Sequence, residues 1–163
     1  MATETYIPLA TVTLATSATN VFLTNISQDY SDLVIVSNII ISNGQEVGIR
    51  FNGDSGDNYL MINMRGTGGS TTTSSIQDSG YVPIQKNVSG NAVVITEIMG
   101  YSKTDRLKAI VNRAGSNNFG VIASAHQWAD TSAVTSIALQ SINGGSIATG
   151  STFKLFGIHG EVV

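Results

Sequence analysis

Short stretches in which apolar and polar residues alternate run along the whole chain, separated by residues that form turns. A period of two predicts β-strands, because successive side chains of a strand point to opposite faces. The pattern contains no helix of convincing length, and it predicts about nine or ten short strands in an all-β fold, an antiparallel β-sandwich of jelly-roll-like form. The stretches that carry it are 6–14, 21–23, 33–41, 47–51, 59–65, 92–99, 119–128, 128–139 and 150–158.

The last two stretches, 128–139 and 150–158, organise this prediction. Each has apolar residues two apart on one face, so each needs a partner sheet. Phe156 and Ile158 also make the opposite face of the final strand apolar, which predicts a strand inside a sheet and not at its rim. The connection around 143–146 is rich in Gly and Asn and predicts a reversal between the two strands.

Three other segments add detail to the predicted fold. The stretches 47–51 and 59–65 flank a run of turn-forming residues and predict a hairpin with an elaborated loop. The segment 105–113 fits helical spacing as well as strand alternation, and the all-β surroundings favour the strand. The segment 66–80 is mostly Gly, Ser and Thr, which predicts a flexible exposed loop within a single domain, 1–163.

Composition narrows the classes of function. The 163 residues are 42% hydrophobic and only 12% charged, about half the usual charged fraction of roughly 25%. A net charge of −3 without a basic cluster argues against nucleic-acid binding. The longest apolar stretch, 33–41, is too short to span a membrane, and the N-terminus does not resemble a signal peptide, so we expect a soluble chain made in a cytoplasm. The absence of cysteine excludes disulfides and thiolate metal sites.

Few residues are candidates for metal chemistry, and we expect no metal and no cofactor. The loop 52–58 places Asp54 and Asp57 among oxygen donors of the kind that calcium binds, but Asp, Asn and Gly are also ordinary turn formers, and that interpretation is favoured. The two histidines, His126 and His159, lie on different predicted strands without further ligands at suitable spacing.

Catalytic motifs are also lacking. No Gly-x-Ser-x-Gly sequence is present, so we expect no enzymatic activity. The single tryptophan, Trp128, suits a sugar-stacking platform or a packing role, and the end of an apolar strand favours packing.

Several segments together resemble a family of tailed-bacteriophage virion structural proteins. The Phe-Asn-Gly-Asp sequence and the closing Leu-Phe-Gly-Ile are the most specific parts of the likeness, which covers most of the chain. The resembling segments are 32–36, 50–59, 128–139 and 150–158. The resemblance implies a small β-sandwich without a catalytic motif on the outside of a virion. Such a protein either cements the capsid or is attached to the tail. The low charge and the long Gly-rich loop favour a capsid decoration (cement) protein, and because proteins of this sort are usually trimers, we expect a homotrimer bound to the major capsid protein on the capsid surface.

This resemblance leads to two further expectations. The polar segments 2–8 and 66–80 are the expected capsid contacts, with the candidates Thr3, Tyr6, Pro8, Thr71 and Thr72. The alternative function is a tail-fibre or receptor-binding module that recognises host-surface glycans, with Trp128, Tyr59 or Tyr81 as the sugar platform. A sandwich-fold hydrolase would need a buried carboxylate or histidine in a pocket, and the sequence offers no candidate pair.

Overall fold

The chain folds into an antiparallel β-sandwich, which confirms the predicted fold class. The computed structural model describes residues 4–66, 72–116 and 120–160, and these residues form strands, turns and bends without a helix. The ten strands of the described part are β1 (Tyr6–Thr13), β2 (Asn20–Leu23), β3 (Asp32–Phe51), β4 (Tyr59–Gly66), β5 (Thr72–Ser79), β6 (Val82–Met99), β7 (Lys108–Ser116), β8 (Gly120–Trp128), β9 (Ile137–Ser141) and β10 (Thr152–Ile158).

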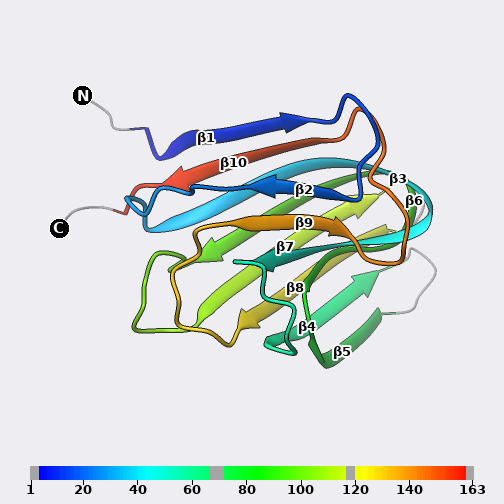
Figure 1. Ribbon diagram of the computed structural model, residues 1–163. Coiled ribbons are helices and arrows are strands. Elements are labelled where there is room, and N and C mark those ends of the chain that lie inside the picture. The colour runs from blue at the N-terminus through cyan, green and yellow to red at the C-terminus, as the bar shows by residue number, and fades with distance from the viewer. Residues whose placement is uncertain (1–3, 67–71, 117–119, 161–163) are drawn as a thin grey trace.

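Two long strands, β3 and β6, belong to both layers of the sandwich. The first half of β3 pairs with β10 and with the second half of β6 in the larger sheet, whose order is β1-β10-β3-β6-β7-β8-β4-β5. The second half of β3 pairs with β9, which in turn pairs with β2, to form the smaller layer. Register shifts between Ile41 and Gly48 mark where β3 passes from one layer to the other. Figure 1 shows β1 and β10 at one end of the larger sheet and β4 and β5 at the other.

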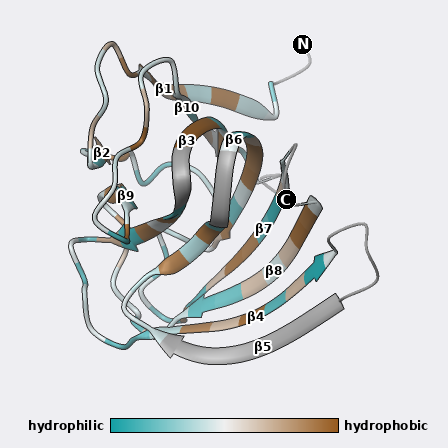
Figure 2. Cartoon of the chain, turned by 90° about the vertical axis from the view of Figure 1, so that its right-hand side faces the viewer, coloured by the Kyte–Doolittle hydropathy of each residue, from teal (hydrophilic) through white to brown (hydrophobic). Residues whose placement is uncertain are grey.

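The core lies between the two layers and is built from every second side chain along the strands, those that point inward. Leu33, Ile35 and Phe153 come from the larger sheet, and Ile49 and Leu139 come from the smaller layer; all are buried. Figure 2, which views the strands more nearly end-on, shows how β7, β8 and β4 continue the curve of the larger sheet. Burial of this apolar surface is the main stabilising contribution to such a fold.

Several details predicted from local patterns are confirmed. Residues 108–116 form strand β7 and not a helix. β10 lies inside the larger sheet between β1 and β3, as the apolar residues on both of its faces predicted.

Other details were wrong, because alternation identifies strands but not their partners. The stretches 33–41 and 47–51 are one strand, β3, and 47–51 forms no hairpin with 59–65, since β4 pairs with β5 and β8. β9 and β10 do not pair with each other either, because they lie in different layers. The segment 66–80 is not a loop throughout: Thr72–Ser79 forms β5, which pairs with β4 along its length.

Candidate functional site

The turn after β3 is held by Asn52, the second residue of the Phe-Asn-Gly-Asp sequence. Its φ of 52° lies in the left-handed region, which asparagine tolerates better than most residues. Its side-chain oxygen accepts hydrogen bonds from the backbone N–H groups of Thr135 (2.9 Å) and Ser136 (3.1 Å), and its amide donates to the carbonyl of Ala133 (2.8 Å). One side chain therefore joins the 52–58 loop to the segment before β9.

Asp54 uses its carboxylate to organise the same loop. One oxygen accepts hydrogen bonds from the indole N–H of Trp128 (2.7 Å) and the amide of Asn58 (3.0 Å), and the other accepts one from the backbone N–H of Gly56 (2.9 Å). No group of three or more metal-ligating side chains occurs among residues 4–66, 72–116 and 120–160. The hydrogen bonds of Asp54 within and beside the loop fit a turn-forming role, and Asp57 is exposed in the same loop.

The Asp54 carboxylate should contribute stability only where it is ionised. Burial alone would raise its pKa, but hydrogen bonds from Trp128, Asn58 and Gly56, with the positive charge of Arg50, together lower the pKa below its ordinary value of 3.8. Because the folded pKa lies below the unfolded one, this contribution is complete above the unfolded pKa and disappears as the pH falls through the folded pKa.

We therefore expect Asp54→Asn to lower the free energy of unfolding by about 1 kcal/mol at neutral pH, since hydrogen bonds to a charged acceptor are lost. The difference from the wild type should shrink once the pH falls below 3.8. Urea denaturation at several pH values measures this, and Asp57→Asn is the matched control in the same loop, expected to stay near the wild type. A difference that persists unchanged into acid would contradict the role assigned to the carboxylate.

Trp128 and Tyr59 are core residues, which corrects their place in the glycan-binding alternative. Their exposed fractions are 1% and 0%, and their rings stack at a centroid distance of 6.4 Å, with Phe51 5.4 Å from Trp128. The Tyr59 hydroxyl accepts a hydrogen bond from the backbone N–H of Phe51 (3.0 Å), and burial raises the pKa of Tyr59 to about 12. A sugar ring cannot reach either aromatic face. Tyr81 is half-buried, and burial with the neighbouring Glu46 raises its pKa to about 12.

A buried lysine beside Trp128 was missed by the sequence analysis. Lys108 has no exposed surface, and its ammonium donates hydrogen bonds to the carbonyls of Arg106 (2.9 Å) and Thr131 (3.0 Å), 5.9 Å from the Trp128 ring centroid. Burial lowers the pKa of Lys108. The available signal was its alternation with Ile110 in β7, which places both side chains on the inward face.

The two histidines lie in different parts of the fold, and each contacts a neighbouring side chain. The His126 side chain is buried in β8, with its Nε2 2.8 Å from the Ser124 hydroxyl. His159 follows β10, and its ring lies 5.1 Å from that of Tyr30. Neither belongs to a metal-binding cluster within the described part of the chain.

The outer face of the larger sheet collects most of the exposed large apolar side chains. Because register aligns outward positions of neighbouring strands, they form rows across the sheet; one row runs Ile62, Ala125, Val111, Glu97 and on to Val34. We call this surface the outer face. Among the side chains that the structure describes, its exposed large apolar residues are Tyr6, Leu60, Ile62, Met64, Val93, Met99 and Val121.

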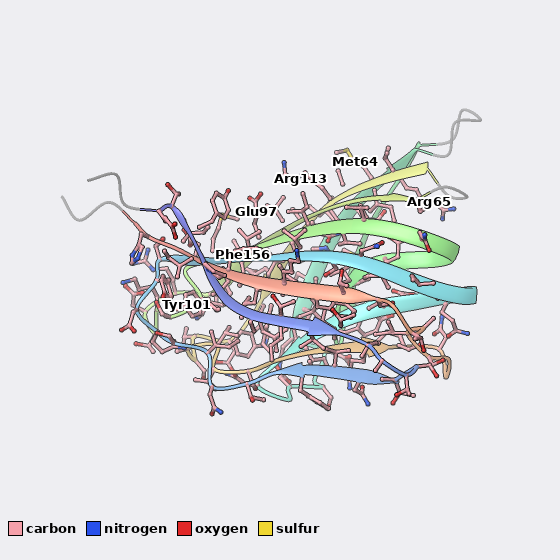
Figure 3. The ribbon with its side chains drawn as sticks, turned by 90° about the horizontal axis from the view of Figure 1, so that it is seen from above. Met64, Arg65, Glu97, Tyr101, Arg113 and Phe156 are labelled. Carbon is pink, nitrogen blue, oxygen red and sulfur yellow. The ribbon has the colours of Figure 1, made fainter. Side chains whose placement is uncertain are left out.

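The outer face carries little charge. Glu97 on β6 and Arg113 on β7 form an ion pair with each other, and Lys154 on β10 is exposed nearby. Figure 3 shows Met64, Glu97 and Arg113 on the same side of the ribbon. A face of this kind resembles the apolar centre of a protein interface more than an ordinary solvated surface.

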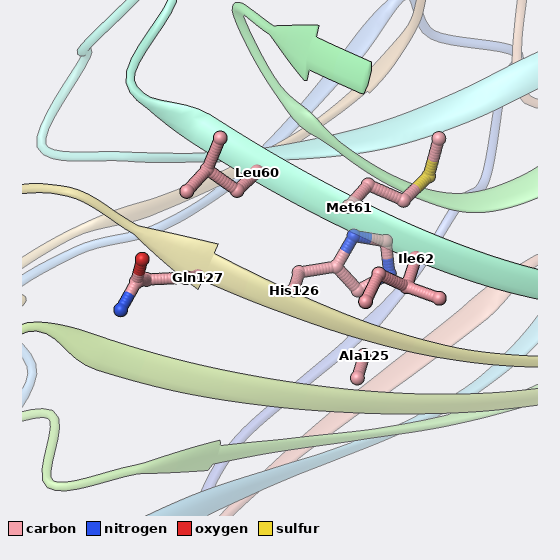
Figure 4. A pocket seen from close by; sticks show the side chains of 6 residues that line it. All are labelled: Leu60, Met61, Ile62, Ala125, His126 and Gln127. Atoms are coloured by element: carbon pink, nitrogen blue, oxygen red, sulfur yellow. The ribbon is translucent and has the colours of Figure 1, made fainter. Parts of the chain in front are cut away.

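Two adjoining depressions hollow the outer face where β4, β8 and β7 lie side by side. Each has a volume of about 330 Å³, and they share Ile62 and Ala125. The small Ala123 and Ala125 of β8 lie between the larger Ile62 and Met64 of β4 and Val111 of β7. Figure 4 shows the first depression, with Leu60 and Ile62 on β4 beside Ala125 and Gln127 on β8.

The proposed capsid-contact residues are not brought together by the fold. Tyr6 and Pro8 are exposed on β1, whereas Thr72 begins β5 at the opposite edge of the larger sheet. Thr3 and Thr71 lie outside the described residues. The outer face extends between these two edges, and local composition did not identify it, because both faces of 59–64 contain apolar residues.

Comparison with known proteins finds similarity in structure only. No family model matches the sequence, and no curated protein matches it. Among solved structures, a marine PL-14 alginate lyase from Aplysia kurodai is similar over 82% of this chain and 70% of its own, with 12% identity and a TM-score of 0.36. The alginate lyase Aly36B, in complex with an alginate tetrasaccharide, is similar over 91% of this chain and 77% of its own, with 12% identity and a TM-score of 0.37.

These similarities correct one expectation. The sequence analysis excluded enzymatic activity, and that exclusion is withdrawn, because both matched structures are enzymes. A likeness of this degree says nothing about a substrate of this chain. In the described part of the chain no helix is long and apolar enough to cross a membrane.

Proposed function

We propose that this chain is a virion structural protein that decorates the outer surface of a bacteriophage capsid, with the major capsid protein and further copies of itself as partners. The resemblance of segments 32–36, 50–59, 128–139 and 150–158 to tailed-phage virion proteins suggests this role. The observation that supports it best is the outer face, a broad apolar surface with little charge. Exposure of such a surface to water raises the free energy of the isolated chain, and a permanent assembly that covers the surface removes this unfavourable contribution.

Segment 50–59, which contains the Phe-Asn-Gly-Asp sequence, has a structural role in the fold. Arg50 donates to the carbonyl of Gly80 (2.9 Å), Asn52 holds the segment before β9, and Asp54 holds Trp128. These residues fasten the end of β3 and the turn after it to the β5–β6 connection, to the segment before β9 and to the end of β8. A rigid platform that presents surfaces is what a decoration protein requires, and we propose a homotrimer at the capsid surface, made in the host cytoplasm.

Mixing the purified chain with expanded, undecorated capsids tests this proposal. We expect saturable co-sedimentation at high copy number. Because only 12% of the residues are charged, electrostatic attraction should contribute little, and binding should persist when NaCl is raised from about 0.1 M to about 1 M. Capsids already decorated serve as the control and should bind little. Failure to bind undecorated capsids at saturating protein would refute the proposed function.

A further inference from the structure

We propose that the outer face is the surface through which copies of this chain bind one another. The centre of the contact is the group Ile62, Ala125 and Val111, which lie side by side in register on β4, β8 and β7. This inference identifies the surface used for the self-association that the proposed function includes. It rests on the proposed function only for what the assembly does.

The outer face has the size that a stable contact between subunits needs. Outward positions form four rows across seven strands, from β1 to β4, as the pairing registers show. At usual strand and residue spacings this is roughly 30 Å by 20 Å. Specific interfaces use about 20 to 30 residues on each side, so this one face suffices without help from a loop.

The charges on the outer face fit a copy of the same chain. Glu97 is paired with Arg113, and Lys154 on β10 and Asp32 at the start of β3 carry opposite charges, so the charges at outward positions from β1 to β4 sum to zero. A strongly acidic or basic partner would gain no electrostatic attraction from such a face, whereas an identical copy meets no net repulsion.

Symmetry adds a second argument for self-association. Residues close to a rotation axis face their own copies, so a charge there would repel itself. Ile62, Ala125 and Val111 are uncharged, as are their neighbours Met64 and Ala123. Arg113, the charged residue that also lines the second depression, is paired with Glu97. The adjoining depressions between β4 and β7 can also take an apolar side chain from the facing copy.

Sedimentation velocity of the full chain over a range of concentrations tests the inference. We expect a mass well above that of one 17.1 kDa chain: three chains would agree with the proposed homotrimer, and two would support the contact and contradict the trimer. Ile62→Lys should raise the dissociation constant by about 100-fold or more, because the substitution places an unpaired charge in the contact. Phe22→Lys is the matched control: Phe22 is 63% exposed on β2 of the smaller layer, and its replacement should leave self-association unchanged. Circular dichroism of both variants checks that they fold.

The outcomes separate this inference from the proposed function. A wild type that stays monomeric at all concentrations overturns the inference, as does an Ile62→Lys variant that is folded and associates like the wild type. Self-association of the wild type without any binding to capsids would refute the capsid role and leave the inference standing. A monomeric wild type that binds capsids, and loses that binding on Ile62→Lys, would assign the outer face to the capsid and overturn the inference.

Discussion

Trp128→Ala is expected to lower the free energy of unfolding by about 4 kcal/mol, the usual range for removing a large aromatic residue from a core. The side chain is 1% exposed, packs 5.4 Å from the Phe51 ring and stacks on Tyr59. Its loss also removes the hydrogen bond to Asp54 and the ring beside the Lys108 ammonium. Guanidinium denaturation followed by far-UV circular dichroism measures the change, since the variant has no tryptophan fluorescence.

Two control variants separate packing from hydrogen bonding at this position. Trp128→Phe keeps most of the apolar volume and removes the indole donor to Asp54, so we expect a loss of about 1 to 2 kcal/mol. Phe22→Ala removes an aromatic ring that is 63% exposed and should change stability by less than about 0.5 kcal/mol. Equal losses for Trp128→Ala and Trp128→Phe would contradict the packing role.

The sequence predicted strands well where alternation is strict, and predicted their partners poorly. Phe153 and Leu155 in β10 follow the period of two and are buried as expected. In β3 the first half is apolar almost throughout and only the second half alternates, so the polar residues 42–46 between them looked like a break between two strands. Turn chemistry at 52–58 correctly indicated a turn, but a turn does not determine which strands pair across it.

The contacts around Trp128 could not be predicted from local patterns, because they join residues that are distant in sequence. Asp54 and Trp128 are 74 residues apart, and Asn52 and Ser136 are 84 apart. The sequence analysis noticed Asp54 as a turn former and Trp128 as a packing residue, without connecting the two. The outer face was missed for a different reason: Tyr59 and Met61 are as apolar as Ile62, so the sequence could not show which side of β4 faces outward.

A buried polar contact between the layers leads to the second large expected effect. Asn112 on β7 has no exposed surface; its oxygen accepts a hydrogen bond from the Thr96 hydroxyl (2.8 Å), and its amide donates to the carbonyl of Ile84 (3.1 Å). Ile84 belongs to the first half of β6, opposite β7 across the core, so this bond joins the two layers. Asn112→Ala leaves the Thr96 hydroxyl and the Ile84 carbonyl buried without this partner, and we expect a loss of about 3 kcal/mol.

Thr96→Val provides the control for this contact, because it removes the hydroxyl and leaves the amide of Asn112 bonded to Ile84. Its expected loss is about 1 kcal/mol. Adding Thr96→Val to Asn112→Ala should then cost less than Thr96→Val costs alone, since the orphaned hydroxyl is removed with it. Guanidinium denaturation of the four proteins gives this coupling directly. Strictly additive losses would mean that the two side chains do not act as a pair, and that packing around Asn112 alone accounts for its effect.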